Sequence, residues 1–456
     1  MFTVHARLGK ISSLKITFLA IGAFFAVMVL CISGLLYFPD IFTNRYIKNK
    51  IIKTFTNAAP SYSMRIAHLH FNIVKNRIGF DTVAIVSKDS TFSGTVGKLS
   101  VSGVKWFQLL LGGKSAYTAF KNSAVTIQEI TLTLRKSQYE FRCKQLHLSI
   151  PKSNISAEAL EVYPFVNDDK FLSGSKFRKT RVRISLPKCK IESVDFNAIL
   201  LGKAYFARSI NIDGAFFDIL VDMDKPYNKG NSKLLMPDEG LALIQQNMRI
   251  DTLNLYNAQL KYAERYFVGA PLAIVTFTSM RLSAEGLASR AASNACAHIW
   301  GQATFMKSGT MKIRMAVPIV SNAVPLRYSG SLDDMDLTKL NAFLETGENL
   351  RIKSGELQKS TFDIKVVGGR ASGGVRALYK NLNIAVVDKS TRSEQGGINR
   401  IKSFAINTIK IRGTNAPDKT GKLIIGEVKY EQKPDDTFFQ LLWFSLRSGV
   451  GSVVGF

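Results

Sequence analysis

The chain has few of the residues that mark disulfide-stabilised proteins or common hydrolases. Its 456 residues include four cysteines, and only Cys143, Cys189 and Cys296 lie outside an apolar N-terminal run. An odd number of widely spaced cysteines predicts neither a disulfide framework nor a zinc site. The sequence also lacks a Gly-x-Ser-x-Gly nucleophile motif. Scattered acidic residues define no catalytic pair, so we expect a protein that is not an enzyme and uses no cofactor or metal.

Three short motifs resemble binding sites but lack essential partners. Gly113-Lys114-Ser115 resembles the end of a phosphate-binding loop, but the first glycine of that loop is missing. His68 and His70 would project from one face of a strand, as metal ligands do, and Cys296 and His298 share this spacing. Neither pair has an evident third ligand, so we expect no metal at either.

Acidic residues are scarce relative to basic ones. The chain has 61 Lys and Arg against 34 Asp and Glu, a formal net charge of +27. This excess implies anionic partners, such as nucleic acid, acidic lipid headgroups or a membrane surface. The basic residues are spread along the chain, and the densest cluster, residues 176–183, fits the solvated face of an edge strand. We therefore expect no nucleic acid, because nucleic-acid-binding domains concentrate their charge.

One long uncharged run lies near the N-terminus. Residues 16–38 would span about 35 Å as a helix, enough to cross a hydrocarbon core of about 30 Å. We predict a cytoplasmic N-terminus at 1–15 and a transmembrane helix at 16–38; a cleaved signal peptide and a buried core helix are the alternatives. Residues 39–57, with Ile51 and Phe55 at helical spacing, predict an amphipathic helix at the membrane surface. The flanking positive charges are nearly balanced and do not set the orientation.

Most of the remaining chain alternates apolar and polar residues, which is the period of a β-strand. We predict a mostly β fold: an elongated, curled, repetitive sheet with a few short helices, comprising a groove region at 58–330 and a C-terminal β region at 331–436. Each strand would have one apolar face and one polar, often basic, face. The candidate residues of an apolar groove lie on the apolar faces: Ile130, Leu132, Leu134, Leu146, Leu148, Ile150, Val182, Ile184, Leu186, Ile313, Phe362, Ile364 and Val366.

A degenerate repeat runs through the middle of the chain. Its common form is an apolar residue, two polar residues and then alternation, as in residues 127–132, 191–200 and 250–260. A repeated strand unit predicts an array that grows in one direction. The glycine pairs at 368–369 and 373–374 predict turns between strands.

Helices are few in the predicted fold. Short ones are expected at Pro237 to Met248 and at Asp333 to Leu344, and an apolar helix or tail at 437–456. Glycines interrupt that tail. It would lie in a membrane interface, plug the end of the sheet, contact a partner or form a plain core segment.

The segment from Leu332 to Asp388 resembles the C-terminal part of the AsmA-like family of bacterial envelope proteins. A short helix with the pattern L..MDL..LN.F leads into I.SG.L followed by spaced glycines and apolar residues. The matching positions include Gly355, Gly369, Gly373, Tyr379 and Leu382. The resemblance implies a single-pass inner-membrane anchor with the bulk of the chain in the periplasm. It also implies a β-groove related to bridge-like lipid-transfer proteins, which moves phospholipid for outer-membrane and envelope biogenesis.

The alternating strands and the resemblance favour the same function. A sheet with an apolar face and few helices to cover it presents that face to an apolar ligand, while Lys and Arg outside meet phosphates. We expect phospholipid or another anionic lipid as the ligand. A closed β core that binds nothing remains an alternative, as does a scaffold or regulator of outer-membrane protein assembly that binds an envelope protein.

Overall fold

A computed structural model describes residues 48–72, 75–105, 116–228, 236–237, 241, 244, 246–290, 294–319, 324–387, 411–434 and 436–455. The expected cytoplasmic segment and transmembrane helix lie outside these residues, as do positions 39–47 of the expected amphipathic helix. Within the described ranges, no helix is both long enough and apolar enough to cross a bilayer.

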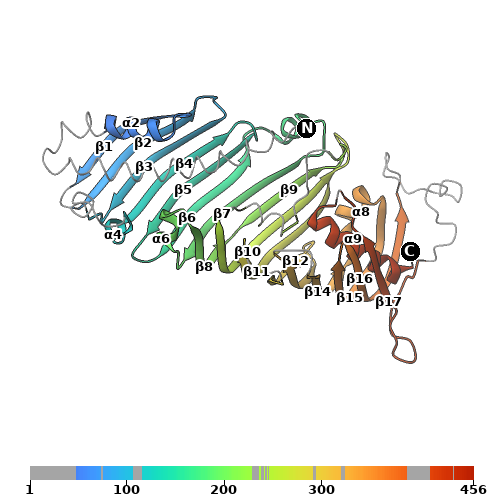
Figure 1. Cartoon of the computed structure of the whole chain (residues 1–456). Coiled ribbons are helices and arrows are strands. Elements are labelled where there is room, and N and C mark those ends of the chain that lie inside the picture. The colour runs from blue at the N-terminus through green and yellow to red at the C-terminus, as the bar shows by residue number, and fades with distance from the viewer. Residues whose placement is uncertain are drawn as a thin grey trace, which may run out of the picture. The chain divides into compact units, whose positions relative to one another are not determined.

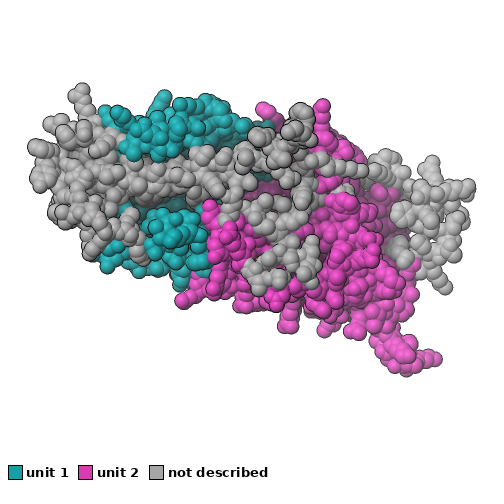
Figure 2. Space-filling view, viewed as in Figure 1, with its two compact units in different colours: residues 1–166, 185–207 teal, residues 167–184, 208–456 magenta. Residues whose placement is uncertain are grey.

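Strands dominate the described residues (Figure 1). Seventeen described strands belong to one mixed sheet, and the described helices are short, which confirms the mostly β prediction. The chain divides into two compact units, shown in different colours in Figure 2. Unit 1 comprises residues 1–166 and 185–207, and unit 2 comprises residues 167–184 and 208–456.

Unit 1 is built on an antiparallel meander in which each strand pairs with the next. Its six strands have eleven residues each: β1 (Tyr62–Asn72), β2 (Arg77–Ser87), β3 (Phe92–Ser102), β4 (Ala124–Leu134), β5 (Tyr139–Ser149) and β6 (Asn154–Pro164). Parts of β7 (Thr180–Glu192) and β8 (Ala204–Asp213) and the short helices α4 (Ala116–Phe120) and α6 (Phe196–Leu200) also belong to it.

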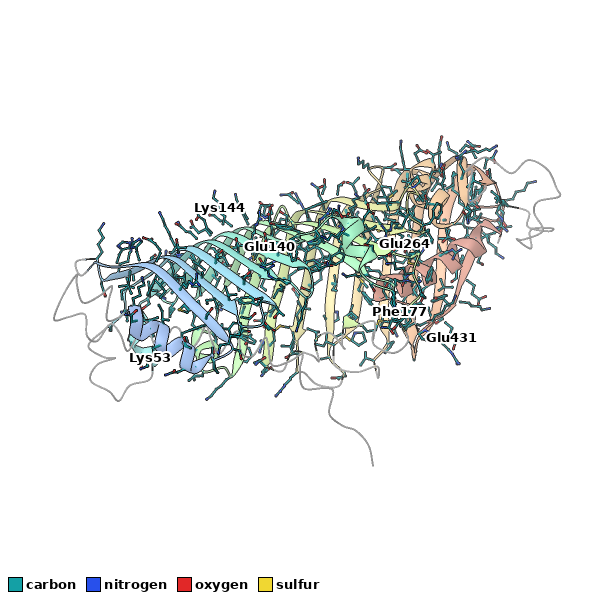
Figure 3. All side chains as sticks on the ribbon, turned by 90° about the horizontal axis from the view of Figure 1, so that it is seen from above. Lys53, Glu140, Lys144, Phe177, Glu264 and Glu431 are labelled. Carbon is teal, nitrogen blue, oxygen red and sulfur yellow. The ribbon has the colours of Figure 1, made fainter. Side chains whose placement is uncertain are left out.

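Helix α2 (Lys48–Ala58) covers part of this meander. Ile51 and Phe55 are 1% and 0% exposed and pack against β1, β2 and β3, while Lys53 on the other side of the helix is exposed (Figure 3). An amphipathic helix is therefore present at Lys48–Ala58, and its position at a membrane surface stays a prediction. Its apolar face is buried on the sheet, because packing against the apolar side chains of the strands removes that face from water.

All six strands of the meander change the phase of their alternation at the same level. In β4 both Ile127 and Ile130 contact the apolar cluster, although an undisturbed strand would place them on opposite faces. Glu129 between them has φ +57°, and Thr82 and Ala159 have the same left-handed conformation in β2 and β6. The registers align positions 67, 82, 97, 129, 144 and 159 in one row across the sheet. We call this row the crease.

The crease explains the degenerate repeat where the repeat crosses it. Each strand has an apolar–x–x–apolar sequence there, as in Phe80 to Val83 and Ile127 to Ile130, and two consecutive residues avoid the apolar face. Gly97 lies in the row because Glu129 Cβ would stand 2.9 Å from any Cβ at that position. The apolar face therefore stays on one side of the sheet across the crease.

Unit 2 contains a second, longer meander. Strand β10 pairs in parallel with β9 and in antiparallel fashion with β11, and antiparallel pairing then continues in chain order to β17. The strands are β9 (Phe216–Asp222), β10 (Asn247–Arg265), β11 (Ala273–Ala288), β12 (Cys296–Phe305), β13 (Gly309–Pro318), β14 (Leu326–Asp336), β15 (Leu350–Val367), β16 (Arg370–Val386) and β17 (Ile425–Glu431).

The helix predicted at Asp333 to Leu344 begins later than expected. Strand β14 continues to Asp336, whose carboxylate caps the 3₁₀ turn η2 (Leu337–Leu340), and α8 (Asn341–Gly347) follows. Half of the positions of the helix predicted at Pro237 to Met248 lie outside the described residues, and its last two positions begin β10.

The C-terminal helix α9 (Phe438–Val454) lies beside β15, β16 and β17 in unit 2 (Figure 1). Thr437 and Gln440 form a capping box at its start. Gly449 contacts Val375 and Val428 so closely that a Cβ would come within 2.5 and 2.7 Å of their methyl groups. The alternative of a plain core segment for 437–456 is therefore the one that the packing of α9 supports.

Candidate functional site

An apolar cluster lies on one face of β3 to β7 in unit 1, and we call it the open cluster. Its buried members are Ile130, Cys143 and Ala157, and partly buried residues pack around them: Val96, Ile127, Leu132, Phe141, Leu146, Leu160 and Cys189. Every member belongs to a strand, so a single layer builds the cluster. An apolar sheet face in a protein is ordinarily buried against a second layer. Among the described residues, no helix contributes to the open cluster.

The two edges of this face are covered to different extents. Toward the ends of β3, β4 and β5 at Ser102, Ala124 and Ser149, Leu148 and Ile150 pack against a core that includes Phe120 of α4. At the opposite end of β4, Leu134 is 47% exposed. The predicted groove residues of β4 and β5 thus divide: Leu148 and Ile150 approach a covered core, and Ile130, Leu132, Leu134 and Leu146 lie on the less covered part.

We call the surface that the members of the open cluster form its floor. Two of these members, Cys143 and Cys189, are thiols. Cys143 is buried and Cys189 is half-buried, and both are free cysteines. Burial raises the pKa of each thiol above its ordinary value, and the nearby Cys143 raises that of Cys189 further. Both thiols are therefore neutral and apolar at neutral pH, which suits contact with hydrocarbon. The sequence alone assigned no role to these two positions.

The predicted groove residues of β7 lie in a different setting. Val182, Ile184 and Leu186 are half-buried, as expected for a sheet face with partial cover. The basic residues that alternate with them are not on a solvated face. Arg181 is 2% exposed and forms an ion pair with Asp218 at 2.9 Å, and it contacts Asp168 at 3.2 Å.

The prediction of a solvated strand face for residues 176–183 is therefore corrected. Carboxylates of unit 2 pair with two of these cations, and a backbone carbonyl accepts a hydrogen bond from a third. Arg183 pairs with Asp168 at 2.6 Å. Lys179 lies 3.6 Å from the centre of the Phe171 ring, in α5 (Asp168–Ser173), and donates to the Phe171 carbonyl. Burial, and then the nearby Lys225, lower the pKa of Lys179. Lys179, Arg181 and Arg183 thus belong to an ionic network, while Lys176 is exposed.

The predicted groove residues of β15 lie in a covered core. Phe362, Ile364 and Val366 are 7%, 0% and 6% exposed, and they share one apolar cluster with Leu441 and Val453 of α9. These three residues are therefore corrected from groove to core, because α9 supplies a second layer over them. Ile313 of β13 is half-buried.

The positions that carry the family resemblance have structural roles. Gly355 has φ +158° and lies between Leu337 and Leu382, which is itself buried. Gly369 has φ +78° in the turn between β15 and β16, as predicted. Tyr379 is buried, and its hydroxyl donates to the Arg412 carbonyl at 2.8 Å. The resemblance thus falls on residues that shape this sheet.

Gly373 corrects one predicted turn. It lies inside β16, and a side chain there would collide with the Asp363 carbonyl of β15. Glycine is needed at that position for the close approach of two strands, so the pair 373–374 does not reverse the chain.

The weak metal motifs find no further ligands among the described residues. His68 and His70 are exposed on β1, and His70 Nε2 lies 2.6 Å from Asp81 Oδ2. Cys296 and His298 lie on β12. No group of three His, Cys, Asp or Glu side chains in the described parts of the chain is arranged to hold a metal ion. Residues 113–115 lie outside those parts.

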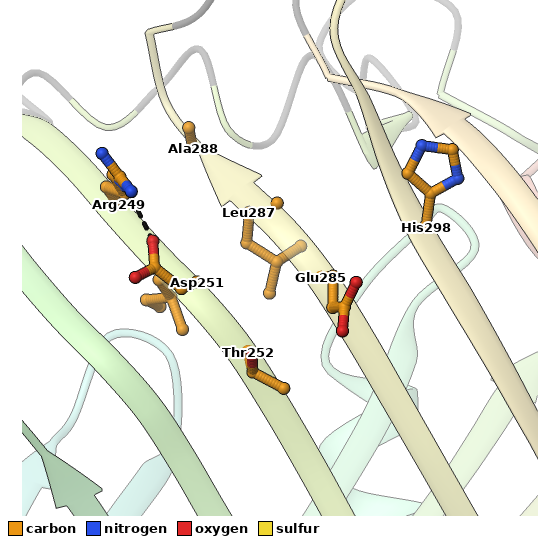
Figure 4. A pocket seen from close by; sticks show the side chains of 9 residues that line it. Arg249, Asp251, Thr252, Glu285, Leu287, Ala288 and His298 are labelled. Atoms are coloured by element: carbon orange, nitrogen blue, oxygen red, sulfur yellow. Dashed lines mark hydrogen bonds and ion pairs between the residues drawn. The ribbon is translucent and has the colours of Figure 1, made fainter.

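An open pocket of ≈ 490 Å³ lies at the ends of β10 and β11 in unit 2 (Figure 4). Arg249, Asp251, Glu285 and His298 are among its lining residues. Arg249 Nε pairs with Asp251 Oδ1 at 2.7 Å, so its charge is already matched within the pocket. Charged side chains line this pocket, so it is less suited to an apolar ligand than the open cluster is.

Comparison with protein-family models finds no match for this chain, and comparison with curated proteins finds none.

Proposed function

We propose that the protein binds phospholipid on the open cluster of unit 1, as a membrane-anchored periplasmic protein that carries or transfers lipid for envelope biogenesis. The observation that carries the proposal is an apolar cluster whose members, within the described part of the chain, all come from a single layer of strands. Exposed apolar surface costs about 25 cal/mol per Å², so a ligand that covers such a face is stabilised by hydrocarbon contact. An acyl chain supplies this contact without requiring hydrogen bonds from the floor.

The chemistry of the floor supports hydrocarbon as the ligand. Its side chains are aliphatic or aromatic apart from two neutral thiols. The opposite face of the same strands is polar: Glu140 accepts from Arg142 at 2.6 Å and from the Tyr163 hydroxyl at 2.8 Å. A sheet with these two faces separates acyl chain from water. The anchor and the periplasmic location rest on the N-terminal run and on the AsmA-like resemblance.

A charge placed on the floor tests the proposal. Leu132→Asp should abolish phospholipid co-purification in mild detergent, because a carboxylate repels acyl chains. The chain should stay folded, because position 132 is half-buried and the aspartate can reach solvent. The matched control is Thr131→Asp on the opposite face, where Thr131 pairs with Arg142 across the strands. Native mass spectrometry counts lipid per chain, and circular dichroism checks the fold. Wild-type protein that is folded and lipid-free would overturn the proposal.

The two floor thiols give an independent readout. In a chain carrying Cys31→Ser and Cys296→Ser, a membrane-permeable maleimide reports access to Cys143 and Cys189. Labelling should be slower with lipid bound than after delipidation, because acyl chain covers the floor. Equal rates in both states would place the lipid elsewhere on the protein.

A further inference from the structure

The two edges of the unit 1 meander differ in cover, and the less covered edge has a defined set of turns. The register pairs Leu134 with Phe92 and with Tyr139, and Tyr139 with Pro164. The turns at 88–91 and 135–138 and the end of β6 therefore share one edge, which we call the open edge. The other edge, at the β3–β4 connection and the turn 150–153, is the closed edge, where Phe120 packs on the sheet.

The open edge carries more positive than negative charge. Lys88, Arg135 and Lys136 are exposed, and none forms a salt bridge within the described parts of the chain. Asp89 is the one carboxylate described in these two turns. It accepts hydrogen bonds from the Ser87 and Thr91 hydroxyls and from the Thr91 amide, which lower its pKa to about 2. Three cations thus share this edge with a single carboxylate, which has its own hydrogen-bond donors and also attracts Lys136.

Backbone hydrogen bonds fix these cations relative to the floor. The Arg135 amide donates to the Thr91 carbonyl at 2.9 Å, which links the two turns. The Phe165 amide donates to the Gln138 carbonyl at 3.1 Å, which links the second turn to the end of β6. The charged positions are therefore set by the sheet rather than by independent loops.

Apolar and cationic groups follow each other directly at this edge. Leu134 is 47% exposed, and Arg135 and Lys136 are the next two residues of the chain. Leu134 continues the alternation of Ile130 and Leu132, both members of the open cluster. The edge thus joins an apolar floor to two adjacent cations, which is the arrangement that an amphiphile with an anionic head requires.

We propose that the open edge binds the phosphate of a phospholipid, through Arg135 and Lys136, while its acyl chains lie on the open cluster. This proposal rests on the proposed function. Arg presents a planar fork that binds phosphate oxygens in a bidentate manner, and Lys adds a point charge. The closed edge is a poor place for the head, because Phe120 and Val104 fill the apolar space beneath it. The ligand class is therefore a diacyl lipid with a phosphate head.

The test compares two probes that share their acyl chains. Full-length protein is delipidated in detergent and titrated with dioleoyl phosphatidylglycerol or with dioleoylglycerol, which lacks the phosphate, and occupancy is read by native mass spectrometry. The variant is Arg135→Glu with Lys136→Glu. Its affinity for phosphatidylglycerol should fall at least ~10-fold, since each cation near a phosphate contributes on the order of a few-fold in affinity. Its affinity for dioleoylglycerol should stay within about twofold of wild type, because neutral heads do not use the cations.

The control places the same charge change on the closed edge. Lys121→Glu with Lys152→Glu reverses two exposed cations there and should leave both affinities unchanged. An equal loss of affinity for both lipids in the open-edge variant would overturn the proposal. It would mean that the substitutions damage the apolar floor, which both lipids contact, rather than a phosphate site. Unchanged phosphatidylglycerol binding would overturn it too, with the proposed function intact. Wild-type protein that binds neither lipid would remove the proposed function itself.

Discussion

The apolar face of β4 and β5 in unit 1 and that of β15 and β16 in unit 2 differ in what covers them. In unit 2, helix α9 packs on the face and leaves Ile364 without exposure. In unit 1, the open cluster consists of strand residues alone, and Leu132 stays half-buried. Equivalent alternation therefore produces a protein core where a helix packs on the face, and a candidate binding surface where no helix among the described residues does. The following predictions separate these two cases.

The largest difference is expected for truncation of one aliphatic side chain in each region. Ile364→Ala should cost ~3–4 kcal/mol of stability, because it leaves a cavity beneath α9. Leu132→Ala should cost about 1 kcal/mol, because water already reaches that side chain. Hydrogen exchange of the β15 and β4 amides measures each effect locally. Ile364→Val is the control and should cost about 1 kcal/mol. Equal costs for the two alanine variants would mean that the open cluster is a covered core.

A larger residue at Gly449 should remove the cover from unit 2. Leucine there would overlap Val375 and Val428, and we expect α9 docking to weaken by ~3 kcal/mol from overpacking. Trp443 packs edge-to-face on Phe343 at 5.7 Å, so its emission should shift to the red as α9 leaves. The same variant should raise lipid binding by unit 2, because the face becomes open. Val450→Leu, at an exposed position of α9, should change neither readout.

The contact of α9 with the end of α8 should depend on pH. Burial raises the pKa of Glu348, while the Arg447 guanidinium at 2.6 Å opposes this shift and the nearby Glu264 adds to it. The folded state therefore binds this proton more tightly than the unfolded chain. The resulting stability is fully present below the unfolded pKa and is lost as pH rises through the raised folded pKa.

Urea titrations followed by Trp443 fluorescence should thus show α9 docking weaken as the pH rises above about 4.5, the ordinary pKa of glutamate. The effect should be smaller than that of the Gly449 change. Glu348→Gln should flatten this dependence, since glutamine does not titrate. A wild-type slope of opposite sign would show that the ion pair with Arg447 outweighs burial.

The smallest expected effect concerns single residues in the left-handed conformation within strands, which both regions contain. Glu129 in unit 1 and Asn381 in unit 2 have φ +57°. Glycine adopts this conformation without steric cost, so Glu129→Gly should be neutral or stabilise unit 1 by up to ~1 kcal/mol. Asn381→Gly should gain less, because asparagine tolerates the left-handed region better than glutamate does. Thermal unfolding measures both, and Glu129→Val should lower the melting temperature.

The alternation of apolar and polar residues was enough to predict a mostly β fold, because the two-residue period of side chains along a strand depends only on local backbone geometry. It did not predict where one face is covered. Phe362, Ile364 and Val366 have the same alternation as Ile130, Leu132 and Leu134, and a helix about 75 residues later in the chain decides their burial. The packing of α2 on the sheet was not predicted for the same reason. An amphipathic helix has one apolar face, and its sequence does not say whether sheet or membrane covers it.

The crease was visible in the sequence as two polar residues between apolar ones, but it was interpreted as the start of a repeat unit. Ile127 to Ile130 carries the pattern clearly, and Cys143 to Leu146 carries it without a left-handed residue. The two polar residues were noted, but no left-handed residue was predicted between Ile127 and Ile130. The ionic role of Arg181 could not be predicted, because its partner Asp218 lies 37 residues away.

The crease also sets how such a sheet can change in length. Because every strand of the unit 1 meander places its phase change at the same level, any two-stranded hairpin of this meander has the same internal register as its neighbours. A duplicated or deleted hairpin would join the remaining strands without turning apolar side chains to the polar face. The apolar face of this meander could therefore be lengthened or shortened by whole hairpins while each remaining strand keeps its register.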